Sequence, residues 1–240
     1  MFEEKQPLLK ELAFTKLGIL LSEDQLKKFS AFGNLMLEWN ERINLTSITD
    51  TEEVIIKHFI DSLTLAKFIK GQSLVDIGTG AGFPGMPLKI CYPELSVTLV
   101  DSLSKRLDFL KEVIRVLDLS GIKTVHSRAE DLGRDSRYRS SFDVVTSRAV
   151  AKLPVLIEYA IPLAKVGGLF LAAKGSKAQE EINESSKALK ELNCQIHEIE
   201  SFSLSEEAEF RTVIIVKKTG ETPKEYPRKA GLPVKKPLIS

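Results

Sequence analysis

The stretch from Leu74 to Gly85, L-V-D-I-G-T-G-A-G-F-P-G, constrains the fold of this chain more than any other. Its first four residues are mostly apolar and predict a buried parallel strand. Four glycines then follow within eight residues, and glycine lets the backbone turn sharply and lets a ligand approach the main chain closely. Pro84 predicts the start of a helix, because the first helical turn does not need its missing N–H. A strand, a glycine turn and a helix in this order indicate a nucleotide or nucleoside cofactor site.

The glycine pattern alone leaves the cofactor open. Gly80 to Gly85 fits G-x-G-x-x-G, and Asp101 follows 21 residues after Gly80, as in dinucleotide-binding proteins. Asp76, however, lies two residues before Gly78, where a carboxylate would repel a pyrophosphate and attract the ammonium group of S-adenosylmethionine. The following helix N-terminus would favour the carboxylate of that cofactor. D-x-G-x-G-x-G is also the usual first motif of class I methyltransferases, so we expect S-adenosylmethionine here.

From residue 73 onward, candidate strands and helices alternate. The candidate strands are 73–77, 96–101, 122–126, 142–147, 168–173, 194–202 and 210–217, and the candidate helices are 84–91, 104–117, 152–164 and 176–191. This order predicts an α/β, Rossmann-like core over 71–218, with a mostly parallel seven-stranded sheet covered by helices on both faces. Ligands of such sheets bind at the carboxyl ends of the strands. We expect residues 1–70 to form a helical extension packed on this core, and 219–240 to form a basic, proline-rich segment.

Charged residues follow three of the expected strands. Asp101 closes the second strand, where it could accept hydrogen bonds from both ribose hydroxyls or instead cap the next helix. The loop 128–131 could read an adenine ring or be an ordinary exposed loop. Arg148 ends the fourth strand, beside the expected reacting methyl group, and its planar cation suits a carboxylate, a phosphate or a purine edge. A structural salt bridge is the alternative for Arg148.

The N-terminal 70 residues carry helix signals. Ser22 and Gln25 form a capping box, and an apolar stripe with helical spacing follows it, which we interpret as core. Asp50 with Glu53 predicts the start of another helix. His58 lies on that helix, where a structural histidine is the more common case.

Composition excludes several classes of protein. The chain has 240 residues, of which 43% are hydrophobic, which is enough for one large domain with an appendage. No apolar run approaches the ~18 residues of a membrane span, and the charged N-terminus does not resemble a signal peptide. Cys91 and Cys194 follow no metal or disulfide pattern. We therefore expect a cytoplasmic protein with no membrane contact and no metal.

The charge is unevenly distributed along the chain. The net charge is only +1, but the segment from Lys217 to Ser240 has seven basic residues against two acidic ones. Such a basic end suits a polyanion, although a solvated tail would have the same composition.

Several motifs together resemble one family, RsmG, also called GidB. The match runs from about residue 20 to the C-terminus. The motifs are Asn44-Leu45-Thr46, His58-Phe59-x-Asp61-Ser62, Asp76 to Gly85, Asp101-Ser102, Lys105-Arg106-x-x-Phe109-Leu110, Arg128-Ala129-Glu130, Ser147-Arg148-Ala149 and Pro227-Arg228-Lys229-x-Gly231-x-Pro233.

The resemblance implies an enzyme that methylates N7 of a guanosine in bacterial 16S ribosomal RNA, with S-adenosylmethionine as cofactor and the RNA or the small ribosomal subunit as partner. We expect a monomer, because nothing in the sequence suggests an extended apolar seam. It implies a catalytic role for Arg148 at the methyl-donor end, with Asn44 and His58 flanking the site. The implied cofactor-binding residues are Gly78, Phe83, Asp101, Ser102, Leu103, Ala129, Glu130 and Arg148, and the glycine motif itself adds Asp76 and Gly80. The implied RNA-binding residues are Arg228 and Lys229, and the basic C-terminal end adds Lys235 and Lys236.

The motifs that other methyltransferases need are missing. The chain has no N-P-P-Y or D-P-P-Y, which grips an amino group, and no Pro-Cys nucleophile. Guanine N7 has a lone pair and no proton, so it needs neither a base nor a nucleophile. Three rival functions are a methyltransferase of small molecules or proteins, a nicotinamide-dependent oxidoreductase, and a non-catalytic RNA-binding factor.

Overall fold

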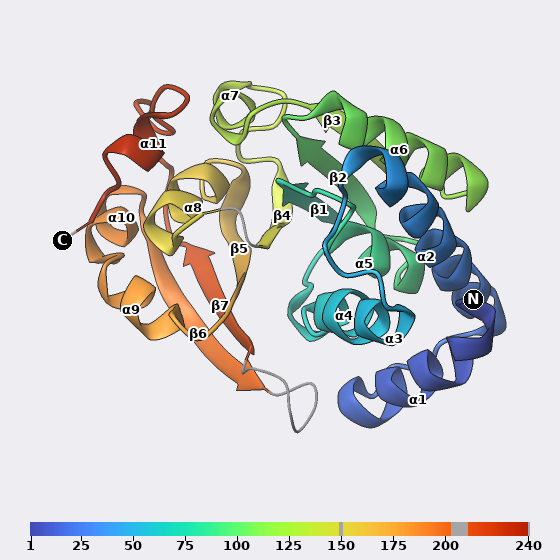
Figure 1. The fold of residues 1–240 in the computed structure, drawn as a ribbon. Helices are drawn as coiled ribbons and strands as arrows, with labels where there is room; N and C mark the ends of the chain where they lie inside the picture. Colours follow the sequence, from blue (N-terminus) through green and yellow to red (C-terminus); the bar gives the residue numbers. More distant parts are fainter. Residues whose placement is uncertain (149–150, 203–210, 240) are drawn as a thin grey trace.

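The computed structural model describes residues 1–148, 151–202 and 211–239. It contains one seven-stranded sheet with the order β3-β2-β1-β4-β5-β7-β6 (Figure 1). The strands are β1 (Ser73–Ile77), β2 (Ser96–Asp101), β3 (Ile122–His126), β4 (Phe142–Arg148), β5 (Ala164–Lys174), β6 (Cys194–Phe202) and β7 (Arg211–Lys218). Strands β1 to β5 pair in parallel, while β7 runs antiparallel to both β5 and β6. The predicted Rossmann-like fold is confirmed.

The strand order reverses at the centre of the sheet. The chain proceeds outward from β1 through β2 to β3 and then returns to β4, which pairs with the other side of β1. A crevice opens at such a reversal, because the connections on its two sides leave in opposite directions. The carboxyl ends of β1 and β4 flank this crevice, so Ile77 and Arg148 lie at its edge.

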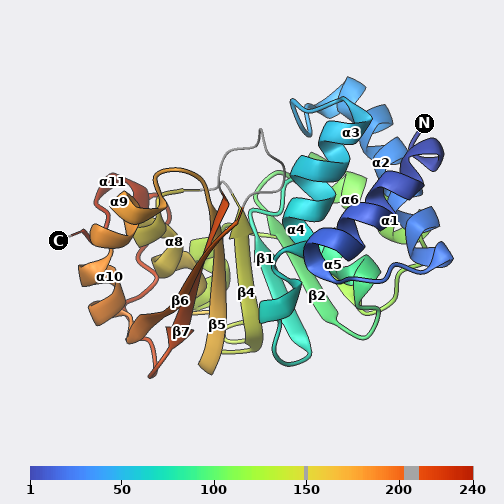
Figure 2. The ribbon, with the colours of Figure 1, turned by 90° about the horizontal axis from the view of Figure 1, so that it is seen from below.

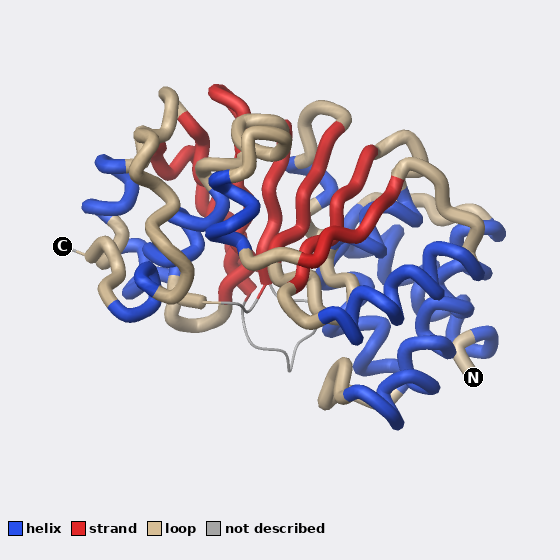
Figure 3. The backbone as a smooth tube through the Cα atoms, turned by 90° about the horizontal axis from the view of Figure 1, so that it is seen from above, coloured by secondary structure: helices blue, strands red, loops and turns tan. Residues whose placement is uncertain are grey.

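Helices cover both faces of the sheet (Figures 2 and 3). The helices are α1 (Gln6–Leu17), α2 (Glu23–Ile43), α3 (Thr51–Val54), α4 (Asp61–Leu63), α5 (Gly85–Cys91), α6 (Ser104–Val116), α7 (Ala129–Arg134), α8 (Leu153–Ala160), α9 (Ala178–Asn183), α10 (Ser186–Glu191) and α11 (Leu232–Lys235). Short helical turns are η1 (Glu3–Lys5), η2 (Ile55–Ile60) and η3 (Ala66–Phe68). None of the helices in the described parts of the chain is long and apolar enough to cross a membrane.

Alternate strand residues belong to two separate hydrophobic clusters, as expected when successive side chains point to opposite faces. Leu74 and Val144 pack in one cluster, which also contains the N-terminal helices, α5 and α6. Val75 and Val145 pack in the other, with α8 and α10. The N-terminal helices therefore share a core with the sheet, and the division of the chain at residues 70 and 218 stays a prediction.

The N-terminal extension follows its capping signals. Ser22 and Gln25 exchange both hydrogen bonds of the predicted capping box. Asp50 accepts from the backbone N–H of Glu52 and Glu53 at the start of α3. The chain then widens into a π-helical turn, η2, and π-turns inside helices are frequent at functional sites.

Phe59 is the centre of an aromatic cluster that joins this extension to the glycine turn. Its ring centroid lies 5.1 Å from that of Phe29, 5.7 Å from that of Phe32 and 6.1 Å from that of Phe83. Phe83 belongs to the glycine stretch. Packing of the helical extension against Phe83 therefore helps to fix the position of the glycine turn.

The structure differs from the predicted elements in several places. Residues 129–134 form α7, where we expected a loop. The helix predicted over 176–191 is divided into α9 and α10, because the Ser185 hydroxyl donates back to the carbonyl of Glu181 and competes with helix continuation. Strand β5 begins four residues before 168 and α8 ends four residues before 164. Residue 210 of the predicted last strand lies outside the described residues.

The C-terminal segment is held against α7 and α8 by side-chain hydrogen bonds to its backbone. The Arg139 guanidinium donates to the carbonyls of Thr222 and Tyr226 at 2.8 and 2.7 Å. Arg134 donates to the carbonyl of Pro227 at 2.7 Å. The segment thus has a defined path although most of it has no regular secondary structure.

We predict that Phe59→Ala lowers the free energy of unfolding by about 3–5 kcal/mol, because it removes a fully buried ring at the centre of the aromatic cluster. Urea denaturation measures this change. The matched control is Phe14→Ala, whose ring is 55% exposed and whose loss should cost less than about 0.5 kcal/mol. Equal losses in the two variants would contradict the central role of Phe59.

Candidate active site

Asp76 holds the glycine turn in place from below. Its Oδ2 accepts hydrogen bonds from the Thr79 hydroxyl at 2.7 Å and from the backbone N–H of Gly85 at 3.0 Å. Its Oδ1 accepts from the Thr146 hydroxyl of β4 at 3.2 Å. One carboxylate therefore connects the turn, the start of α5 and the neighbouring strand.

The buried position of Asp76 bears on the role that we expect for it. We predicted a carboxylate that faces the ammonium group of the cofactor, but Asp76 is completely buried and does not line the cavity described below. Burial raises the pKa of Asp76 to about 6, while hydrogen bonds from Thr79, Gly85 and Thr146 oppose this rise. Asp76 thus shapes the turn from a buried position, and its contact with the cofactor stays a prediction.

Close packing explains the last glycine of the stretch. A Cβ on Gly85 would lie 2.4 Å from Cδ2 of Leu99 and 3.1 Å from Oδ2 of Asp76. The start of α5 can approach the sheet this closely only without a side chain at that position. Glycine is needed at position 80 for a different reason, since residues with a side chain rarely adopt its φ of +59°.

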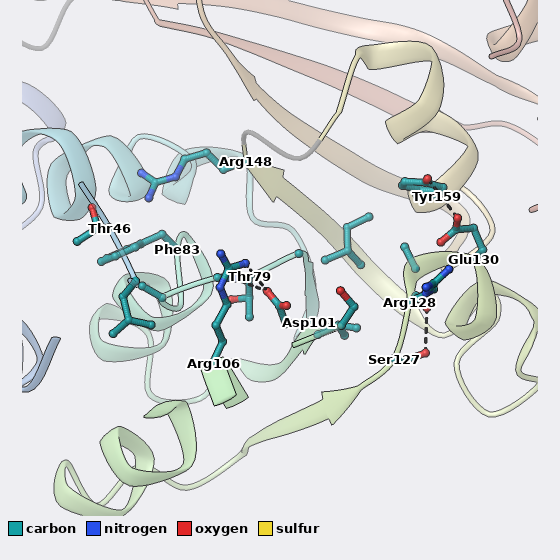
Figure 4. A pocket seen from close by; sticks show the side chains of 18 of the residues that line it. Thr46, Thr79, Phe83, Asp101, Arg106, Ser127, Arg128, Glu130, Arg148 and Tyr159 are labelled. Atoms are coloured by element: carbon teal, nitrogen blue, oxygen red, sulfur yellow. Dashed lines mark hydrogen bonds and ion pairs between the residues drawn. The ribbon is translucent and has the colours of Figure 1, made fainter. Parts of the chain in front are cut away.

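A cavity of about 610 Å³ opens over this turn, within the usual size range of small-molecule sites (Figure 4). Eight of the predicted cofactor-binding residues line it, namely Gly78, Gly80, Phe83, Asp101, Ser102, Ala129, Glu130 and Arg148. In Figure 4, Thr46, Phe83 and Arg148 lie at one end, Glu130 and Tyr159 lie at the other, and Asp101 lies between them. Leu103 does not line this cavity. Its backbone N–H donates to Asp101 instead.

Asp101 is fixed at the middle of the cavity. Its Oδ2 accepts from the backbone N–H of Gly80 and its Oδ1 accepts from that of Leu103, both at 2.9 Å. Nη1 of Arg106 lies 3.5 Å from Oδ2. Each carboxylate oxygen retains capacity for a further hydrogen bond, so Asp101 can bind a pair of hydroxyl groups. The alternative role as a side-chain cap is not seen, since the N-cap of α6 is Leu103.

Glu130 joins the far end of the cavity to the C-terminal segment. Its Oε1 accepts from the Tyr159 hydroxyl at 3.2 Å and from the backbone N–H of Gly231 at 2.9 Å. The carboxylate is buried although it lines the cavity. The cavity wall and the basic end of the chain therefore share one acidic group.

Arg148 links β4 to the helical extension at the other end of the cavity. Its Nη1 donates to Oδ2 of Asp61 at 2.9 Å and to the carbonyl of Lys57 at 3.1 Å. Its guanidinium carbon lies 5.0 Å from the centre of the Phe83 ring, a cation–π contact. Arg148 has the structural salt bridge that we considered as an alternative, and it still lines the cavity.

His58 lies in the same cluster. Its ring stacks on Phe83 with centroids 4.6 Å apart, and its Nε2 lies 2.9 Å from the hydroxyl oxygen of Thr46. Burial and the positive charge of Arg148 lower the pKa of His58 to about 3, so this histidine is neutral at physiological pH. Asn44, by contrast, ends α2 and does not line the cavity.

A second cavity, of about 560 Å³, lies on the other side of His58 and Arg148, which line both cavities. Asp61 and Arg211 also line it, and Nε of Arg211 lies 3.3 Å from Oδ1 of Asp61. Two guanidinium groups therefore share one carboxylate there and leave an excess of positive charge. Ala149, which follows Arg148 in the predicted motif, lies outside the described residues.

Only three of the four predicted RNA-binding residues are exposed. Lys229, Lys235 and Lys236 are exposed on the C-terminal segment. Arg228 instead forms a two-pronged ion pair with Glu158, with Nη2 to Oε2 at 2.6 Å and Nε to Oε1 at 2.9 Å. The Glu158 side chain is 1% exposed, so this pair anchors the segment, and a phosphate contact of Arg228 stays a prediction.

The sequence model of the family described as "GidB: rRNA small subunit methyltransferase G" matches residues 25–209. A protein named ribosomal RNA small subunit methyltransferase G from Desulfitobacterium hafniense is 60% identical over 239 residues, covering 100% of both chains. The protein of the same name from Acetivibrio thermocellus is 49% identical over 241 residues, covering 98% of this chain and 99% of that one. This chain belongs to the rRNA small subunit methyltransferase G family. The resemblance to RsmG is confirmed.

A solved structure supports the fold assignment. A structure described as a SAM-dependent methyltransferase from Aquifex aeolicus superposes with a TM-score of 0.55 at 15% identity, covering 72% of this chain and 96% of that one. At this identity the similarity shows the class I methyltransferase fold. The N-terminal helical extension of this rRNA small subunit methyltransferase G member packs beside that fold.

Sequence reasoning did not single out the roles of Thr46, Tyr159, Asp61 and Arg211. Thr46 and Asp61 belong to motifs that we quoted. The search for functional residues at the carboxyl ends of the strands does not find them, because they come from the helical extension. Tyr159 lies on α8, which we interpreted as a covering helix. Arg211 begins β7 and reaches Asp61 only through folding.

We predict that Asp76→Asn keeps affinity for S-adenosylmethionine within about threefold, while Asp76→Ala lowers it more than tenfold. The amide oxygen can accept from Thr79 and Gly85, and the amide nitrogen can donate to the Thr146 hydroxyl oxygen. Isothermal titration calorimetry measures both affinities. A large loss in Asp76→Asn would indicate direct contact with the cofactor ammonium and would contradict a purely structural role.

The same variant tests the raised pKa. The folded-state pKa of Asp76, about 6, exceeds its ordinary value of 3.8, so ionisation in the native state costs stability as pH rises between these values. Relative to wild type, Asp76→Asn should gain about 2.4 kcal/mol of unfolding free energy between pH 4 and pH 7. Urea denaturation at several pH values measures this gain, and a pH-independent difference would contradict the raised pKa.

Proposed function

We propose that this protein transfers a methyl group from S-adenosylmethionine to N7 of a guanosine in the 16S RNA of the small ribosomal subunit. Membership of the rRNA small subunit methyltransferase G family carries this proposal. We place the enzyme in the cytoplasm, acting as a monomer without a metal.

The proposed orientation of the cofactor follows from the cavity. Ala129 and Glu130 receive the adenine at one end, and Asp101 accepts the two ribose hydroxyls in the middle. Thr46, Phe83 and Arg148 would then surround the sulfonium methyl group. The cofactor, when bound, would supply an activated methyl group, which N7 would accept as the carbon–sulfur bond breaks.

The residues at this end suit a reaction that moves no proton. His58 is neutral and engaged with Arg148, and both cysteines lie outside the cavity lining. Guanine N7 attacks with its own lone pair, so alignment and exclusion of water are sufficient. We propose that an unpaired guanine enters through the second cavity, where Arg148 and Arg211 attract its phosphate.

A methyl-transfer assay tests the function. Small ribosomal subunits and deproteinised 16S RNA, both from bacteria lacking the corresponding enzyme, are incubated with labelled S-adenosylmethionine and then cleaved by a chemistry selective for 7-methylguanosine. We expect label in RNA and one cleavage site. Label without cleavage would contradict N7, and cofactor binding without label would favour a small-molecule or protein substrate.

We predict that the triple variant Lys229→Ala, Lys235→Ala, Lys236→Ala lowers the salt slope of RNA binding, d log K/d log[salt], by about 2–3 in magnitude, because each lysine neutralises one phosphate. Fluorescence anisotropy with labelled RNA at several salt concentrations measures the slope. The control replaces Lys10, Lys16 and Lys27 of the N-terminal helices by alanine, which removes the same charge at a distance from the C-terminal segment.

Arg228 should behave differently from the three lysines. Arg228→Ala leaves the Glu158 carboxylate buried and unpaired, so the free energy of unfolding should fall by about 3–5 kcal/mol. The double variant Arg228→Ala, Glu158→Gln removes the unpaired charge and should keep the wild-type salt slope. A slope reduced by about 1 in this double variant would show that Arg228 does contact phosphate.

A further inference from the structure

We infer that the hydroxyl group of Thr46 donates a hydrogen bond to O6 of the target guanine and so selects guanine over adenine. This inference rests on the proposed function and concerns the reacting end of the same cavity. It follows from the hydrogen-bond chain Arg148–His58–Thr46, which determines what the Thr46 hydroxyl can do.

The first step is the tautomer of His58. Nη2 of Arg148 lies 3.2 Å from Nδ1 of His58. A guanidinium nitrogen only donates, so Nδ1 must accept and carries a lone pair. The neutral ring then carries its hydrogen on Nε2. The carbonyl of Lys57, also 3.2 Å from Nδ1, receives its hydrogen from Nη1 of Arg148 at 3.1 Å.

The second step is the state of the Thr46 oxygen. Nε2–H of His58 donates to this oxygen at 2.9 Å, and the backbone N–H of Ile48 donates to it at 3.0 Å. A hydroxyl oxygen accepts two hydrogen bonds, so both acceptor positions are filled. What remains is the hydroxyl hydrogen, which no hydrogen bond between described residues uses. Thr46 is therefore a donor only.

The third step is the place of Thr46. It is half-buried and lines the cavity. Figure 4 shows it beside Phe83 at the same end as Arg148, away from Asp101 and Glu130. An adenosine bound along Asp101 and Glu130 leaves Thr46 facing the site of methyl transfer, beside His58 and Arg148, which also line the second cavity.

The chemistry of the base completes the inference. N7 and O6 of guanine are adjacent acceptors on one edge, whereas adenine has an N6 amino donor in place of O6. A hydroxyl that only donates matches O6 and leaves the N7 lone pair free for the methyl carbon. In adenine, the same hydroxyl would face the N6 amino group. Both groups are then donors, and two donors cannot form a hydrogen bond with each other. A site that is built to donate a hydrogen bond to its substrate rejects an analogue that cannot accept it, because the donor of the site is then left unpaired.

The test combines a protein change with an atomic change in the substrate. Once the target nucleotide is mapped, 16S RNA is ligated with guanosine or 2-aminopurine riboside there, since 2-aminopurine keeps N7 and lacks O6. Wild type, Thr46→Val and the conservative Thr46→Ser are compared by single-turnover methyl transfer, and their dissociation constants for S-adenosylmethionine are measured separately.

We expect wild type to prefer guanine over 2-aminopurine by at least about tenfold, the size of one hydrogen bond made to the reacting base. Thr46→Val should reduce this preference by the same factor while keeping cofactor affinity within about twofold. Thr46→Ser should restore the preference. Any other difference between the two bases affects every variant alike and cancels when the variants are compared.

Three outcomes would overturn the inference while the proposed function stands. An unchanged preference in Thr46→Val would show that O6 is read elsewhere. Weaker cofactor binding in Thr46→Val with an unchanged preference would assign the hydroxyl to the cofactor carboxylate. Nitrogen-15 NMR of His58 showing the hydrogen on Nδ1 would remove the first step. Absence of 7-methylguanosine in wild-type reactions would instead overturn the proposed function itself.

Discussion

The buried carboxylate of Asp76 is the interaction on which the site depends. It is the shared acceptor for the Thr79 hydroxyl, the Gly85 N–H and the Thr146 hydroxyl, so one side chain connects the glycine turn, helix α5 and strand β4. Burial of a carboxylate is costly unless hydrogen bonds offset it, and its raised pKa is the sign of that cost. The turn above Asp76 then exposes its backbone to the cavity.

The helical extension completes the site from the other side. Thr46, His58 and Asp61 come from it, and they meet Arg148 of β4 through the hydrogen bonds and the ion pair described above. Phe83 of the glycine stretch contacts both His58 and Arg148. The reacting end is therefore a junction between extension and sheet, and the C-terminal segment makes a similar junction at Glu130. In this way the two ends of the chain meet the two ends of one cavity.

The sequence predicts the strand-based half of the site well, because local signals determine it. A short apolar run, glycines and strand-end charges are properties of neighbouring residues, and they locate Gly78, Asp101 and Glu130 at the cavity. The direction in which a side chain faces is less accessible to sequence reasoning. Asp76 fits the pattern of a ligand contact and yet lies beneath the turn, and Arg228 fits a basic tail and yet pairs with Glu158. Each has a partner about 70 residues away, Thr146 for Asp76 and Glu158 for Arg228, that only the folded chain brings near.

The central claim is that one cavity holds S-adenosylmethionine with its adenine at Glu130 and its methyl group at Arg148 and Thr46. A crystal structure of the complex with S-adenosylmethionine tests this most directly. We expect ribose hydroxyls within hydrogen-bond distance of Asp101 and a methyl group that faces the gap between Thr46 and Arg148. Adenine found at the Phe83 end, or a methyl group directed toward Glu130, would contradict it.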